Sequence, residues 1–90
     1  MSTSRQTERI VKGFANHRRI DMLKLIKNRP ELSLNEVSSE LRVNLKTASE
    51  HLRRLAIAGL ILKRNRGQNV LHKVSPLGDD ILKFLRKLEQ

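Results

Sequence analysis

Residues 44–60 read NLKTASEHLRRLAIAGL, and this stretch decides how the chain around it must fold. Asn44 is a favoured residue at the start of a helix, and Gly59 is a favoured residue just beyond a helix end. The segment therefore predicts a helix over residues 45–58. Polar and basic side chains occur along its length. The question is whether that polar side is only solvated or contacts a partner.

A second short helix is predicted directly before this one, in SLNEVSSEL at residues 33–41. Ser33 and Glu36 have the Ser-x-x-Glu spacing of a capping box, in which each side chain accepts a hydrogen bond from the backbone amide of the other residue. The helix should therefore begin at Leu34. After Leu41 only the tripeptide RVN intervenes before the next helix, and two short helices joined by such a turn form a helix-turn-helix.

The remaining elements follow from hydrophobic spacing and from capping residues. Runs rich in β-branched residues, LILKRN and VLHKV, flank the polar loop RGQN at residues 66–69 and predict a β-hairpin with a basic tip, which is a wing. We predict helices over 7–14, 17–28, 34–41, 45–58 and 76–90, and strands over 60–65 and 70–74. The fold class is mainly α with a small β-hairpin, a winged helix-turn-helix in the order α-α-α-α-β-β-α, and residues 1–90 form a single domain.

Composition narrows the choice of partner. The 90 residues include 19 Lys and Arg against 9 Asp and Glu, a net charge of +10, and such a field attracts polyanions. Nucleic acid is the first candidate and an anionic membrane surface the second. No apolar run approaches the roughly 18 residues that span a bilayer, so we expect a soluble cytoplasmic protein without a membrane partner, associated with the nucleoid.

The positive charge is concentrated in one part of the chain. Residues 42–74 hold eight basic residues against one acidic residue, a net +7, whereas the other 57 residues hold eleven against eight, a net +3. At about 100° per residue, Lys46, Glu50 and Arg53 fall opposite a stripe centred on Ala48, with Ser49 and Arg54 on the flanks. The polar face of the helix therefore carries groups that hydrogen-bond to base edges or phosphates.

From Phe14 to Gly78 the chain resembles the ArsR-like winged-helix transcription regulators. The matching pieces are FANHRRIDMLKLI for the opening helix, LSLNEVSSELRVNLKTASEHLRRLAIAGLI for the helix-turn-helix, and VSPLG for the exit from the wing. The resemblance implies a homodimer that sets two recognition helices into successive major grooves of double-stranded DNA, with the wings against the flanking backbone. It implies a sequence-specific transcriptional regulator that acts by occupying an operator, most simply as a repressor.

Within this scheme the polar residues divide into two groups. The expected base readers are Lys46, Thr47, Ser49, Glu50 and Arg53. The expected backbone contacts are Arg42, Asn44, Arg54, Arg64, Arg66, Gln68 and Asn69. Glu50 and Leu45 depart from the family pattern, in which polar or basic residues are common at these positions. Glu50 could accept a hydrogen bond from cytosine or repel phosphate, and the sequence does not decide between these roles.

The two end helices carry more apolar residues than a small core needs. Pairing across a two-fold axis would bury this surplus, so residues 1–14 and 76–90 are predicted dimerisation elements. The predicted interface residues are Ile10, Val11, Phe14, Leu77, Ile81, Phe84, Leu85 and Leu88. Folding of these residues back onto the same chain is the alternative.

The residue composition also bears on other functions. A low-specificity architectural DNA-binding protein and a winged helix used for protein contacts stay open as alternatives. RNA binding lacks aromatic stacking residues, since Phe14 and Phe84 are the two aromatics. Ser49 and His51 point about 200° apart on one helix, which is unsuited to a nucleophile and its base. With no cysteine and scattered histidines, we expect no metal site, no cofactor and no enzyme.

Overall fold

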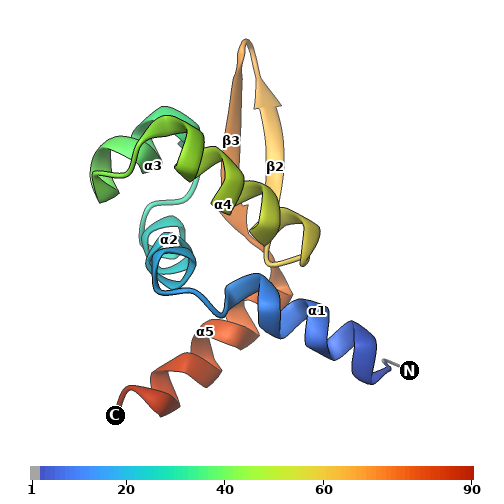
Figure 1. The fold of residues 1–90 in the computed structure, drawn as a ribbon. Coiled ribbons are helices and arrows are strands. Elements are labelled where there is room, and N and C mark those ends of the chain that lie inside the picture. The colour runs from blue at the N-terminus through green and yellow to red at the C-terminus, as the bar shows by residue number, and fades with distance from the viewer. Residues whose placement is uncertain (1–2) are drawn as a thin grey trace.

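The computed structural model describes residues 3–90, which form five helices and a three-stranded antiparallel sheet (Figure 1). The elements in chain order are α1 Ser4–Phe14, α2 His17–Asn28, β1 Leu32–Ser33, α3 Leu34–Leu41, α4 Leu45–Ile57, β2 Ile61–Arg66, β3 Asn69–Val74 and α5 Pro76–Leu88. The predicted fold class, a mainly helical winged helix-turn-helix, is confirmed.

Four helices begin where a side chain caps the first backbone amides, as the sequence predicts. The side-chain oxygens of Asn16, Ser33, Asn44 and Ser75 accept these amide hydrogen bonds. The predicted start of α1 near residue 7 was wrong, because Thr3 and Gln6 form a capping box that starts this helix at Ser4. Residues 1 and 2 of the predicted dimerisation element 1–14 lie outside the described residues.

The helix-turn-helix is fixed by its core contacts and by its turn. Val37 on α3 and Ala48, Leu52 and Leu55 on α4 are at most 2% exposed, and they pack with α2 in one hydrophobic core. Val43 is buried in the turn between the two helices. This packing leaves the opposite face of α4 in solvent, as the helical spacing predicts.

The sheet contains a strand that the sequence did not reveal. β1 pairs antiparallel with β3, which lies between β1 and β2. Leu32 faces His72, and the His72 ring donates from Nδ1 to the Leu32 carbonyl at 2.8 Å. Burial lowers the pKa of His72, so the ring is neutral at pH 7. Two residues are too few to show the alternation by which strands are recognised.

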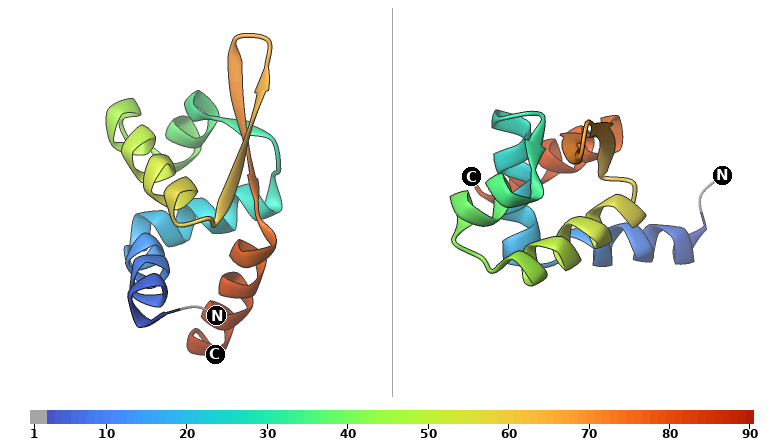
Figure 2. Two further views of the ribbon diagram at one scale, coloured as in Figure 1. Left: turned by 90° about the vertical axis from the view of Figure 1, so that its right-hand side faces the viewer. Right: turned by 90° about the horizontal axis from the view of Figure 1, so that it is seen from above.

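The apolar residues of the end helices divide between the core and the surface. Phe14 and Leu85 are only 7% and 6% exposed within one chain, so their assignment to a dimer interface is corrected: both belong to the core of the protomer. Ile10, Leu77 and Ile81 are partly buried against that core. Val11, Phe84 and Leu88 remain exposed on α1 and α5, which lie at the end of the molecule away from the wing tip (Figure 2).

Candidate nucleic-acid interface

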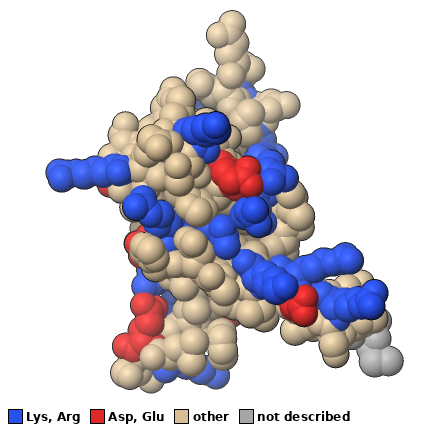
Figure 3. All heavy atoms as spheres, in the orientation of Figure 1, with Lys and Arg blue, Asp and Glu red and all other residues tan. Residues whose placement is uncertain are grey.

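The polar face of α4 is the centre of a basic surface. Lys46, Ser49, Glu50 and Arg53 are exposed on it as predicted, whereas Thr47 is half-buried beside the core stripe. Figure 3 shows Lys and Arg side chains gathered over α4 and continuing onto α1, with acidic groups interspersed. The orientation of α4 was therefore predicted correctly, but the basic surface extends further than the predicted region 42–74.

The first turn of α4 opens onto a hollow of about 480 Å³. Asn44 uses its side-chain oxygen to cap this helix, accepting from the Thr47 amide at 2.8 Å. Arg42, in the left-handed conformation with φ of 53°, and Arg18, from the first turn of α2, both line the same hollow. Two helix N-termini and two guanidinium groups therefore face one space, an arrangement that favours a phosphate group.

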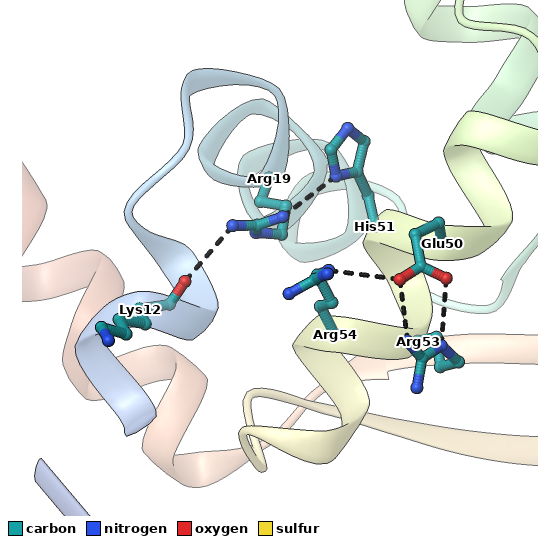
Figure 4. Close-up of polar contacts among 6 residues, drawn as sticks. All are labelled: Lys12, Arg19, Glu50, His51, Arg53 and Arg54. Atoms are coloured by element: carbon teal, nitrogen blue, oxygen red, sulfur yellow. Dashed lines mark hydrogen bonds and ion pairs between the residues drawn. The ribbon is translucent and has the colours of Figure 1, made fainter. Parts of the chain in front are cut away.

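Glu50 binds two of the predicted DNA-contacting residues (Figure 4). Its Oε2 accepts from Nε of Arg53 at 3.1 Å, and its Oε1 accepts from Nη2 of Arg53 at 2.8 Å and from Nε of Arg54 at 3.2 Å. The hydrogen bonds from Arg53 are the chief cause that lowers the pKa of Glu50 to about 2. The carboxylate is therefore ionised at neutral pH, and it holds both arginines at the surface.

A second network joins three helices beside this group (Figure 4). Nη1 of Arg19 donates to Nδ1 of His51 at 3.2 Å, and Nη2 donates to the Lys12 carbonyl at 3.2 Å. A guanidinium can only donate, so Nδ1 of His51 accepts and the ring is neutral. Burial and then the charge of Arg19 lower the pKa of His51. His51 thus links α4 to α2.

The basic surface extends onto α1, which no local pattern in the sequence indicates. Gly13 lies so close to Ala58 that a side chain on it would collide with the Ala58 methyl group, and this contact brings α1 against the end of α4. A hollow of about 330 Å³ results, with Arg9, Lys12, Arg53, Arg54, Gly13, Ile57 and Ala58 around it. The contributions of Arg9 and Lys12 were missed because they depend on tertiary packing, which local charge counts do not reveal.

The wing extends beyond α4 and carries the other predicted backbone contacts (Figure 1). Arg66 and Asn69 pair as the last residue of β2 and the first of β3, so the turn is shorter than the predicted loop 66–69. Both are exposed, as is Gln68 between them. Arg64, lower on β2, donates to Glu31 at 3.0 Å. The wing therefore presents one ion-paired arginine and one at its tip.

Over residues 3–90 no three His, Asp or Glu side chains come together in a way that could hold a metal ion. Asp79, at the start of α5, instead pairs with Lys27 at 2.8 Å. None of the helices that the structure describes has the length and apolar character needed to cross a membrane.

The helix-turn-helix followed by a basic hairpin places the chain in the winged helix-turn-helix class. The model of the bacterial regulatory proteins of the arsR family matches residues 16–63, and the chain belongs to this family. The resemblance inferred from the sequence is thereby confirmed. Membership among these regulatory proteins also confirms the prediction that the chain is not an enzyme.

Individual relatives agree with this assignment. The transcriptional activator HlyU of Vibrio cholerae is 35% identical over 66 residues, which are 73% of this chain and 60% of that protein. The structure of its reduced form has a TM-score of 0.80 at 30% identity, covering 94% of this chain and 90% of that one. A homodimeric winged helix-turn-helix DNA-binding domain from Mycobacterium bovis has a TM-score of 0.84 at 25% identity, covering 93% and 78%.

Proposed function

We propose that the protein is a sequence-specific regulator of transcription that binds double-stranded DNA as a homodimer. In this proposal α4 enters the major groove and the wing tip lies on the flanking backbone. The observation that carries the proposal is the exposed face of α4, where Lys46, Ser49 and Arg53 project from a helix whose other face is locked in the core. The named relatives, a transcriptional activator and a DNA-binding domain, support it.

The polar residues of this surface take two roles in this proposal. Phosphate contacts supply most of the affinity and carry no sequence information, whereas contacts to base edges select the site. We assign base contacts to Lys46, Thr47, Ser49 and Arg53. We assign backbone contacts to Arg42, Asn44, Arg54, Arg64, Arg66, Gln68 and Asn69. Arg18 joins the second group, because it lines the same hollow as Arg42 at the start of α4.

Dimerisation is assigned to the end helices. Val11, Phe84 and Leu88 are 45%, 49% and 64% exposed, although each is apolar. A two-fold axis through α1 and α5 would bury this surface and leave α4 and the wing free. Residues Ile10, Leu77 and Ile81 would then lie at the edge of the same interface, because each is partly buried in the protomer.

The regulatory effect follows from where the dimer binds. Occupying an operator that overlaps a promoter excludes polymerase, so repression is the simplest outcome. HlyU carries the name of an activator. A promoter-reporter measurement with and without the protein distinguishes activation from repression. Binding to chromosomal DNA would place the protein on the nucleoid in the cytoplasm.

The test is selection of bound sequences from a random duplex pool at about 150 mM salt. The enriched and random duplexes are then compared across salt concentrations. A palindromic consensus bound on the order of a thousandfold more tightly than random duplex is expected of a regulator. Salt-sensitive binding with no consensus would instead identify an architectural DNA-binding protein. No binding to duplex at low salt would identify a winged helix used for protein contacts.

A further inference from the structure

Glu50 is an acidic residue in the middle of a surface proposed to bind a polyanion. A carboxylate there repels phosphate, so its presence needs a compensating role. The carboxylate makes three hydrogen bonds, all of them to arginines one turn further along the same helix. Residues three and four apart are neighbours on a helix surface, so the spacing of Glu50, Arg53 and Arg54 places the three groups together.

The geometry at Arg53 determines what this arginine can still bind. A guanidinium has five N–H donors in a fixed plane. Glu50 engages the edge formed by Nε and Nη2 with two roughly parallel bonds, the bidentate geometry of strong Arg–carboxylate pairs. This pairing leaves both N–H groups of Nη1 and the second N–H of Nη2 available to a ligand. One N–H of Nη1 and the free N–H of Nη2 form the end of the guanidinium, and this pair can meet O6 and N7 of one guanine.

The same carboxylate has little capacity left for a base of its own. A carboxylate offers about four acceptor positions, and Arg53 and Arg54 use three of them. About one acceptor position remains, so a cytosine amino group would have to share the carboxylate with both arginines. Of the two roles that the sequence left open for Glu50, the structure thus disfavours the cytosine contact and adds a third.

We propose that Glu50 is a positioning residue that fixes the Arg53 guanidinium for reading a guanine and thereby sets the sequence specificity of the protein. This inference rests on the proposed binding to double-stranded DNA. At a matching site the Arg53–guanine contact offsets the repulsion between Glu50 and the backbone. At other sites the repulsion stays without the contact, so Glu50 lowers affinity for wrong sequences more than for the right one.

The chain offers a matched control for the charge of Glu50. Glu31, in the loop between α2 and β1, also accepts from an arginine of the proposed DNA surface, Arg64 at 3.0 Å. Arg64 lies on strand β2 of the wing, where no base contact is proposed. Glu50→Gln and Glu31→Gln each remove one negative charge beside predicted DNA contacts, which are Arg53 and Arg54 for Glu50 and Arg64 for Glu31. The side-chain amide introduced by Glu50→Gln presents an NH2 group to the guanidinium in place of one oxygen, so the pair of parallel bonds is lost.

The experiment measures the ratio of affinities for the selected duplex and for random duplex. The proteins compared are wild type, Glu50→Gln, Arg53→Ala, the double variant and Glu31→Gln, each checked for wild-type helical content by circular dichroism. The Glu50→Gln protein should bind random duplex more tightly than wild type does. Its ratio of affinities for selected over random duplex should be about tenfold lower, which is part of the discrimination that one bidentate arginine–guanine contact provides. Arg53→Ala should lower the ratio at least as much, and the double variant no further, because Glu50 acts through Arg53.

The outcomes separate this inference from the proposed function. Glu31→Gln should raise affinity for both duplexes alike and leave the ratio unchanged. If Glu50→Gln also leaves the ratio unchanged, the pair is only a surface ion pair and the inference is wrong. If the losses of the two single variants multiply in the double variant, Glu50 reads a base by itself, and the inference is again wrong. A wild-type protein that selects no consensus contradicts the proposed function before Glu50 is tested.

Discussion

Phe84→Ala should dissociate the proposed dimer while leaving the protomer folded. Phe84 is 49% exposed on α5, so about 100 Å² of a ring of roughly 200 Å² is available to a partner. Alanine retains a small part of this surface, and about 80 Å² is lost, which at about 25 cal/mol per Å² costs about 2 kcal/mol. A two-fold interface contains the residue twice, so the total of about 4 kcal/mol raises the dimer Kd about a thousandfold.

Sedimentation equilibrium over a series of protein concentrations measures this change. Leu62→Ala is the matched control, because Leu62 is similarly exposed at 53% but lies on β2 of the wing. Its dimer Kd should equal that of the wild type. Leu85 is unsuitable for this test, since it is buried in the protomer and its replacement by a charged residue would unfold the chain.

Two results would refute the reasoning. A Phe84→Ala dimer within a few fold of wild-type affinity would mean that α5 does not form the interface. Equal weakening by Leu62→Ala would place the wing in the interface, which would be incompatible with wings lying on DNA. Circular dichroism of each variant should show the helical content of the wild type, because neither side chain contributes to the core.

Three further predictions concern binding and stability. Arg66→Ala should weaken binding to the selected and the random duplex alike, and it should reduce the steepness of log affinity against log salt by about one. A loss of affinity for the selected duplex alone would contradict a backbone contact. Gly78→Ala would drive a methyl group into the Leu60 carbonyl and should lower the free energy of unfolding in urea by about 1–3 kcal/mol; an unchanged value would contradict this close packing. Burial lowers the pKa of His72 in the folded protein, so the unfolded chain binds a proton more readily than the folded one. The free energy of unfolding should therefore decrease as the pH falls from about 7.5 to 5.5, through the ordinary histidine pKa near 6.5. A urea midpoint that is constant over this range would contradict the pH prediction.

Much of the fold could be predicted because its signals are local. Capping residues and helical spacing act within one or two turns, and Asn16, Ser33, Asn44 and Ser75 cap their helices as the sequence indicates. β1 escaped prediction because its two residues are held by a partner strand that is distant in the sequence, with Leu32 opposite His72. A strand defined only by its pairing leaves no periodic pattern in the sequence.

The apolar residues of the end helices show a second limit of sequence reasoning. Spacing identifies which residues share a helix face but not which surface covers that face. Phe14 and Leu85 turn toward the core of their own protomer, whereas Phe84 and Leu88 do not. Neighbouring residues of α5 therefore differ in their proposed roles, and only the tertiary arrangement separates them.

The candidate interface was predicted as a set of exposed residues but not as a set of interactions. The helical wheel correctly put Glu50 and Arg53 on the exposed face, and their spacing of three residues already allowed an ion pair. Arg19 and Lys12 come from other helices, so their approach to α4 depends on packing that no local pattern records. Local spacing thus shows what can pair within a helix, and the fold decides which other residues join the surface.

The acidic residues of this surface bear on the choice between a regulator and an architectural protein. Glu31 and Glu50 each hold an arginine that is proposed to contact DNA. An arginine that keeps its carboxylate on binding contributes less to counterion release, so affinity for DNA of any sequence is reduced. A protein that coats DNA without selecting sites gains nothing from such pairs. A regulator must dissociate from random sites to find a matching one. The lower affinity that Glu50 causes at non-matching sites adds to its specificity, and for this reason we favour the regulator.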